Sequence, residues 1–171
     1  MKQIAIAAAL TVCVVSTGHA EILLTYDESA ATPHFEISND SACATGAMEV
    51  LIDLESSAAE LFFDNRTTGA NLFDAALAPF RIESGADRVS QVDEPDTGSG
   101  RIAIRLSDMM PGESVSFSID VDDQLDDGER ADALAEGSRI AGAVAVVAKD
   151  GSERAALYGA QGAASVDIGG C

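Results

Sequence analysis

The chain has 171 residues and a formal net charge of −19, from 29 acidic and 10 basic side chains. Its length is typical of one domain, and a hydrophobic content of 47% is enough to form a core. The negative charge argues against nucleic acid as a partner, because that binding depends on Lys and Arg neutralising phosphates. Tryptophan is absent and aromatic residues make up only 5%, so we expect an aliphatic core of Val, Ile, Leu and Ala.

The first twenty residues have the pattern of a secretory signal peptide. Lys2 precedes an apolar run from Ile4 to Val15, and small residues follow up to Ala20. The run is too short for a membrane-spanning helix, although an uncleaved anchor is the alternative. We expect residues 1–20 to be removed and residues 21–171 to form one secreted or periplasmic domain without a membrane span. Loss of the signal changes the net charge from −19 to −20, since it removes one basic residue and no acidic one.

Three cysteines are present, and the first leaves with the signal peptide. Cys43 and Cys171 remain, an even number in a chain bound for an oxidising compartment. We predict a disulfide between them, which would close a long loop and stabilise the fold by about 4 kcal/mol in the chain-entropy model. A free thiol at Cys171 for intermolecular pairing is the alternative.

Apolar and polar residues alternate with a period of two along most of the mature chain, which predicts half-buried strands. The clearest segments are MEVLIDLE, RIAIRLS and SVSFSIDVD, at residues 48–55, 101–107 and 114–122. Weaker candidates are EILLTY, HFEIS, ELFFD, APFRIE, AVAVVA and ERAALY.

Turn residues separate the expected strands. Asp150-Gly151 favours a tight hairpin, and Met110-Pro111-Gly112-Glu113 is also interpreted as a hairpin turn. Residues 126–137 are compatible with one helical turn or a loop. Several short strands with turns between them predict an all-β fold, an antiparallel immunoglobulin-like β-sandwich in a single domain.

An acidic run follows the strand at residues 114–122 and is the strongest candidate site. Asp120 and Asp122 lie two residues apart, so their side chains point the same way from a strand. Carboxylates in loops are the ligands that Ca²⁺ prefers. The run does not fit an EF-hand, because the third loop position would be Leu125. The alternative is a solvated acidic loop that protects a sheet edge. The predicted calcium ligands are Asp120, Asp122, Asp123, Asp126 and Asp127.

Other motifs give little support for catalysis. His34 is the one histidine that remains after the signal and is expected on an outward strand face. Asp96-Thr97-Gly98 matches an aspartic protease signature, but Pro95 precedes it and no second copy exists, so we interpret it as a loop. Asn39 and Asn65 match glycosylation acceptor patterns and are interpreted as incidental turn residues. No catalytic residues are therefore predicted.

Three stretches carry a family resemblance: SACATGAMEVLIDLESSAAELFFDN, APFRIESGAD and LSDMMPGESVSFSIDVDD, at residues 41–65, 78–87 and 106–123. They resemble small secreted bacterial proteins of the aggregation factor core type, named after the core of the sponge aggregation factor, a calcium-dependent cell-adhesion proteoglycan. The resemblance covers roughly residues 34–148, and its motifs are structural. The segment after Asp123 is more charged than the family pattern, so the resemblance carries no ligand role over to Asp126 and Asp127.

The resemblance and the composition together lead to one functional expectation. We expect a secreted, non-enzymatic module that supports adhesion or aggregation, is stabilised by calcium, and binds a cell-surface protein or glycan. A secreted hydrolase with a carboxylate pair, and a periplasmic structural domain without a ligand, are the alternatives.

Overall fold

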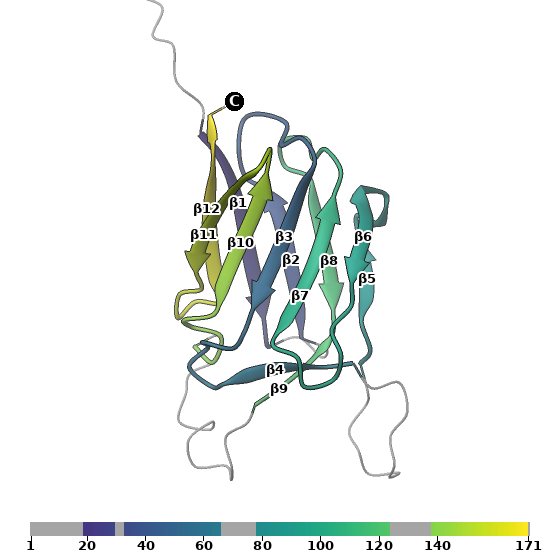
Figure 1. Cartoon of the computed structure of the whole chain (residues 1–171), viewed down its shortest axis with the longest axis vertical. Coiled ribbons are helices and arrows are strands. Elements are labelled where there is room, and N and C mark those ends of the chain that lie inside the picture. Colours follow the sequence, from purple (N-terminus) through teal and green to yellow (C-terminus); the bar gives the residue numbers. More distant parts are fainter. Residues whose placement is uncertain (1–18, 30–32, 66–77, 124–137, 171) are drawn as a thin grey trace, which may run out of the picture.

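The computed structural model describes residues 19–29, 33–65, 78–123 and 138–170. These residues form two five-stranded antiparallel sheets that pack face to face, with a two-stranded sheet across one end (Figure 1). The first sheet has the order β12-β1-β2-β8-β5, with bounds Ala163–Gly170, His19–Asp27, His34–Asn39, Ser114–Ser118 and Arg81–Ser84. The second has the order β11-β10-β3-β7-β6, with bounds Ser152–Leu157, Val144–Lys149, Met48–Asp53, Arg101–Leu106 and Val89–Asp93. The small sheet pairs β4, Leu61–Asp64, with β9, Asp120–Asp123.

This architecture confirms the prediction of an all-β fold with two packed antiparallel sheets. No α-helix occurs among the described residues, where a 3₁₀ turn, Ala86–Arg88, links β5 to β6. The immunoglobulin-like connectivity stays a prediction. Cleavage of a signal peptide after Ala20 also stays a prediction. The pairing of β1 with β12 is irregular between Ala20 and Glu21 and regular from Glu21 onward.

The alternating pattern puts one face of each strand into the core, as the sequence predicts. On β3 the side chains of Met48, Val50 and Ile52 are buried, and on β7 those of Ile102 and Ile104 are. Alternate positions on both strands face solvent and carry charged groups, with Leu51 and Ala103 as the apolar exceptions. Burial of these aliphatic side chains stabilises the fold by roughly 1.5–3 kcal/mol each before chain entropy is counted.

The expectation of an aliphatic core is wrong at the lower end of the sandwich, where aromatic rings gather. Phe35 and Phe117 lie opposite each other on β2 and β8, with ring centroids 5.1 Å apart and nearly parallel planes. Tyr26 contacts Phe35 at 4.7 Å, and Phe63 of β4 contacts it at 6.0 Å. The low aromatic content did not predict this cluster. Even a few aromatic residues can contact one another when they lie in register on neighbouring strands.

The two predicted hairpin turns have different outcomes. Asp150-Gly151 connects β10 to β11 with φ angles of 51° and 76°, and Lys149 pairs with Ser152, which confirms a tight two-residue hairpin. Met110–Glu113 is not a hairpin turn, because β7 belongs to the second sheet and β8 to the first. The segment instead carries the chain from one sheet to the other.

The segment predicted as one strand over residues 114–122 is two strands. β8 ends at Ser118, and β9 begins at Asp120 in a different sheet. Ile119 between them is fully buried, so the apolar pattern continues through the bend. Alternation alone could not reveal the break, because both halves bury the same parity of side chains.

The upper end of the sandwich is organised around the buried side chain of Asn39 at the end of β2. Its amide nitrogen donates to the carbonyl oxygens of Cys43 at 2.8 Å and Met109 at 2.9 Å. Its amide oxygen accepts the backbone N–H of Ser41 at 3.1 Å. One side chain therefore joins the β2–β3 loop to the β7–β8 connection. The prediction of an incidental turn residue is wrong here.

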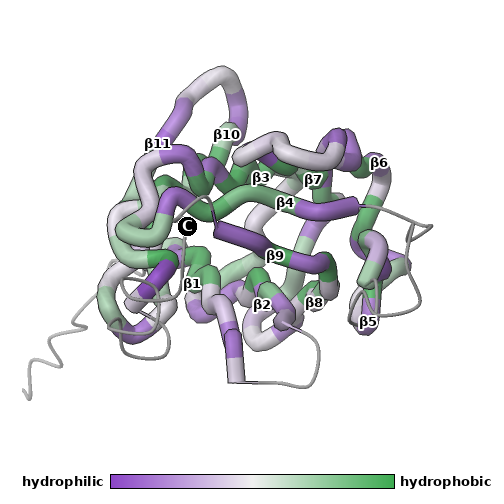
Figure 2. Tube along the Cα trace, turned by 90° about the horizontal axis from the view of Figure 1, so that it is seen from below, coloured by the Kyte–Doolittle hydropathy of each residue, from purple (hydrophilic) through white to green (hydrophobic). Residues whose placement is uncertain are grey.

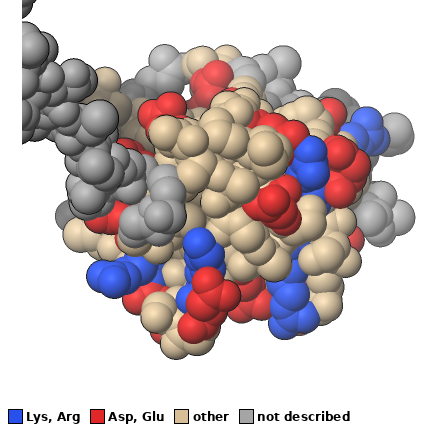
Figure 3. Space-filling view, turned by 90° about the horizontal axis from the view of Figure 1, so that it is seen from above, with Lys and Arg blue, Asp and Glu red and all other residues tan. Residues whose placement is uncertain are grey.

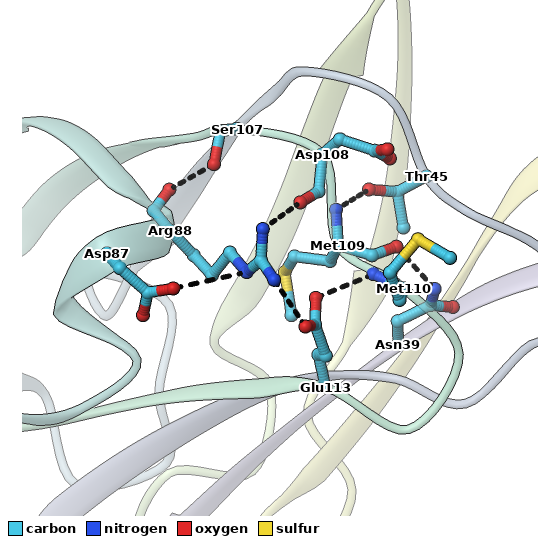
Figure 4. A network of polar contacts seen from close by, with 9 residues as sticks. All are labelled: Asn39, Thr45, Asp87, Arg88, Ser107, Asp108, Met109, Met110 and Glu113. Atoms are coloured by element: carbon cyan, nitrogen blue, oxygen red, sulfur yellow. Dashed lines mark hydrogen bonds and ion pairs between the residues drawn. The ribbon is translucent and has the colours of Figure 1, made fainter.

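Further contacts fix the same connection (Figure 4). The backbone N–H of Met109 donates to Thr45 Oγ1 at 3.1 Å, and Met110 N donates to Glu113 Oε2 at 2.7 Å. Arg88 forms an ion pair with Glu113 and reaches the carbonyl of Asp108 at 3.4 Å. Much of the stretch that carries the family resemblance therefore holds the two sheets together.

We predict that Asn39→Ala lowers the free energy of unfolding by about 2–3 kcal/mol, because it removes the hydrogen bonds that the buried amide forms with Cys43, Met109 and Ser41. Urea denaturation followed by circular dichroism measures the change. Asp40→Ala is the matched control, since this exposed neighbour contributes its backbone N–H to Glu21 and should change stability by less than about 0.5 kcal/mol. Equal losses in the two variants would contradict the role of the amide.

Candidate functional site

The predicted acidic site lies at the lower end of the sandwich, where β4 and β9 cross between the two sheets (Figure 2). Phe63 and Val121 lie opposite each other in this small sheet and are buried against the core. The apolar side of β4 and β9 therefore closes the end of the sandwich, and most of the acids of the two strands lie on their other side.

Register decides which acidic side chains lie together. Asp64 pairs with Asp120, and Phe62 pairs with Asp122. Directly opposite residues project from the same face of a sheet, as do residues two apart on one strand. Asp64, Asp120 and Asp122 therefore share one face. Asp64 is buried and accepts a hydrogen bond from Thr97 Oγ1 at 3.3 Å, and Asp120 Oδ1 accepts the N–H of Val121 at 3.1 Å.

Asp123 projects from the opposite face and is held by an arginine. Arg139 forms ion pairs with Asp123 through Nη2 and with Glu28 through Nη1. Burial lowers the pKa of Arg139, but hydrogen bonds and charges from Glu28 and Asp123 outweigh it and raise the pKa above its ordinary value. The three side chains tie the end of β9 to the segment after β1. A metal-binding role for Asp123 would compete with this ion pair.

The described residues contain no group of three or more His, Cys, Asp or Glu side chains placed to hold a metal ion. Asp126 and Asp127 lie outside the described residues. The acids that look crowded in sequence are divided by strand alternation, because Asp120 and Asp122 face one way and Asp123 the other. Calcium binding stays a prediction.

His34 lies on the outward face of β2, as predicted, and lines a hollow of about 380 Å³ together with Glu83, Ser116 and Ser118. The Ser118 hydroxyl donates to Glu83 Oε1 at 2.6 Å. A serine activated as a nucleophile donates to a general base such as imidazole. Here the hydroxyl donates to the Glu83 carboxylate and not to the imidazole of His34.

A second hollow, of about 390 Å³, is lined by Glu55 and Glu60 and bears on the hydrolase alternative. Both side chains are exposed, and Glu55 Oε2 accepts a hydrogen bond from Arg101 at 3.0 Å. The Glu55 carboxylate is therefore engaged in an ion pair with Arg101 and does not face a second carboxylate across a shared proton. The Asp96-Thr97-Gly98 segment beside this hollow is an exposed turn, as interpreted from the sequence.

Three residues of the lower end were not found from the sequence: Glu28, Asp64 and Arg139. Their roles depend on pairing between segments far apart in the chain, which a single sequence does not reveal. One signal was available for Arg139: it is one of few basic residues and directly precedes an apolar segment beginning at Ile140.

Cys43 lies in the β2–β3 loop, and this loop and the end of β12 are both at the upper end of the sandwich (Figure 1). Gly170, the last described residue, pairs with His19, and Asp40 N donates to the carbonyl of Glu21 on the same strand β1. Both cysteine-bearing segments thus meet the beginning of β1. Cys171 lies outside the described residues, so the bridge stays a prediction.

The two tyrosines of the chain are both buried. Burial and the negative charges of Glu28 and Asp120 raise the pKa of Tyr26, against the opposing charge of Arg139. Burial alone raises the pKa of Tyr158, whose hydroxyl is buried without a hydrogen-bond partner in the described structure. Both phenols are therefore strongly held in the neutral form.

Comparisons with protein-family models, with curated proteins and with solved structures find no match. Within the described residues, no helix is both long and apolar enough to cross a membrane.

We predict that neither tyrosine ionises at its ordinary pKa of about 10 in the folded protein. Below that pH the phenols are protonated in both states and their contribution to stability is complete. Above it the unfolded chain loses protons that the folded chain retains, so the free energy of unfolding falls as pH rises. Phenolate absorbance should appear in one step together with loss of the circular dichroism signal.

Tyr158→Phe tests the assignment to a particular ring. It should leave stability unchanged or raise it at neutral pH, because it removes a buried hydroxyl without a partner, and should weaken the alkaline loss. Phenolate absorbance that rises near pH 10 in the folded protein would contradict both burial arguments.

Proposed function

We propose that this protein is a secreted, non-enzymatic β-sandwich module of the periplasm or cell surface that supports adhesion or aggregation. The observation that supports it best is an apolar row across the outer face of the second sheet. The row follows the register of four neighbouring strands and consists of Ala155, Val146, Leu51 and Ala103.

The surroundings of this row support a partner-binding role. Leu157, on the same strand and face as Ala155, is 65% exposed. Ion pairs flank the row, with Arg105 Nε 2.6 Å from Glu49 Oε2 and Arg101 Nε 2.8 Å from Asp53 Oδ2. Ala155 is exposed, and Val146, Leu51 and Ala103 are half-buried. Apolar surface with a charged rim is typical of sites that bind other molecules.

The chemistry of the row favours a protein over a glycan. Its side chains are aliphatic and lie on a pleated sheet, which suits contact with apolar side chains of a partner. Sugars usually bind polar hollows, and the row has neither an aromatic ring nor a hydroxyl group. We therefore propose a cell-surface protein as the partner and treat glycan binding as an outcome of the test below.

Calcium stabilisation is the second part of the proposal. Asp64, Asp120 and Asp122 share one face of the small sheet, and a divalent cation would offset their mutual repulsion. Ca²⁺ needs six to eight oxygen ligands, so carbonyls, water or the predicted ligands Asp126 and Asp127 would complete the shell. Asp123 is the weakest of the predicted ligands because of its ion pair with Arg139.

We predict that beads coated with the mature protein bind to cells of the source and clump in the presence of calcium. Leu157→Asp should abolish binding by placing a charge on the apolar face. Met110→Asp is the matched control, since Met110 is also large, apolar and 51% exposed but lies at the upper end of the molecule. Loss of binding after protease treatment of the cells indicates a protein partner, and loss after glycosidase treatment indicates a glycan.

If the beads bind neither cells nor one another, with or without calcium, the adhesive role is wrong. If Met110→Asp and Leu157→Asp weaken binding equally, the proposed face is wrong.

We predict that calcium raises the melting temperature of the mature protein relative to chelator. At a hundred times the dissociation constant the gain is about 2.7 kcal/mol, or roughly 5–11 °C for a domain of this size. Asp122→Asn should remove the shift, whereas Asp87→Asn should keep it, because Asp87 is an exposed carboxylate in the turn between β5 and β6. An unchanged melting temperature would show that calcium does not stabilise the protein. The proposed adhesion would then be tested by the bead assay alone.

A further inference from the structure

A hollow of about 220 Å³ opens between the β10–β11 hairpin and the end of β12. Val147 and Ile168 form its apolar floor, and Lys149, Ser152 and Arg154 stand around it. Asp150 and Gly169 complete the lining. At about 30 Å³ for each water molecule, the hollow holds roughly seven waters, which is room for a small organic group.

Strand geometry explains how two cations reach this hollow. On β10, Lys149 has the same parity as the buried Val147, so it projects toward the space between the sheets. Arg154 pairs with Val147 across the hairpin and therefore shares that side. Ile168 of β12 has the same parity as the buried Val166. The hollow is thus the upper opening of the interior at the edge of the sandwich.

These two cations lack the ion pairs that most described arginines form. Arg88, Arg101, Arg105 and Arg139 each form ion pairs with carboxylates. Neither Lys149 nor Arg154 forms an ion pair with any described residue, although acids outnumber bases almost threefold in the chain. Figure 3 shows acidic and basic side chains intermixed around an uncharged centre at this end of the molecule. Two cations without an ion pair to a described residue therefore stand beside one hollow, whose lining contains one carboxylate, that of Asp150.

We propose that this hollow binds the carboxylate of a small organic acid with a short apolar body. The guanidinium of Arg154 can donate two parallel N–H bonds to a carboxylate, and the ammonium of Lys149 adds a second positive charge. The Ser152 hydroxyl offers a further donor. Val147 and Ile168 then receive the apolar part of the ligand. Larger polyanions are disfavoured, because the mature chain carries a net charge of −20.

Inward-pointing charges on an edge strand also have a simpler role, since they prevent edge-to-edge pairing of sheets. That role requires repulsion alone and no bound anion. It predicts that replacing the cations makes the protein self-associate and leaves the response to small carboxylates unchanged. The two explanations are therefore separable by experiment.

Butyrate is the probe, added at constant ionic strength to the isotope-labelled mature protein. Amide resonances of Gly151, Ser152 and Gly169 should shift and saturate with a dissociation constant on the order of 1 mM. Arg154→Gln should weaken binding about tenfold or more, as should replacing butyrate by neutral butyramide. Arg81→Gln is the matched control, because Arg81 is an exposed cation on the opposite edge, strand β5, and also forms no ion pair with a described residue.

Each contrary result overturns the proposal. Shifts that do not saturate, or that spread evenly over the surface, show that no site exists. Equal weakening by Arg81→Gln and Arg154→Gln shows that butyrate responds to net charge alone. Sulfate that binds as tightly as butyrate shows that Val147 and Ile168 do not contribute to binding. Self-association of Arg154→Gln with unchanged butyrate binding shows that the cations prevent edge-to-edge pairing instead.

Discussion

The structure depends most on the buried amide of Asn39. Two sheets in a sandwich are joined by connections that cross the end of the core, where backbone groups lose their strand partners. Asn39 supplies a donor pair to carbonyls from two such connections and an acceptor to the loop that follows it. A buried polar side chain with all its bonds satisfied specifies one arrangement of loops, because any other leaves its groups unpaired. The mutual position of the sheets at this end follows from that requirement.

Most of the fold could be predicted from alternation, and the exceptions have physical reasons. Val115, Phe117, Ile119 and Val121 are all buried as the pattern requires, but a period of two does not say which sheet a strand joins. The bend at Ile119 and the crossing at Met110–Glu113 both depend on that choice. Strand β6 was not predicted, because most of its side chains are exposed and its sequence therefore lacks a clear apolar face.

The candidate site was less predictable than the fold. Local spacing placed Asp120 and Asp122 on one face of a strand, and the structure agrees. It could not place Asp64 beside them or Arg139 beside Asp123, because these contacts join segments that meet only through tertiary pairing. The sequence predicts a cation site from the number of acidic residues in one segment. In the structure, the face of the strand and the partner of each carboxylate decide which of them lie together. The apolar row on the second sheet has the same character, since its four members come from four strands.

The pairing of β1 with β12 has a consequence for how the chain reaches this state. The first and last described strands are neighbours, so β1 lacks one of its two hydrogen-bonded partners until nearly the whole polypeptide is available. Contacts between such distant segments form slowly. During vectorial synthesis or export, an open strand edge would persist until the C-terminal segment emerges. A chain truncated before residue 163 would retain that edge permanently and would be prone to misassembly.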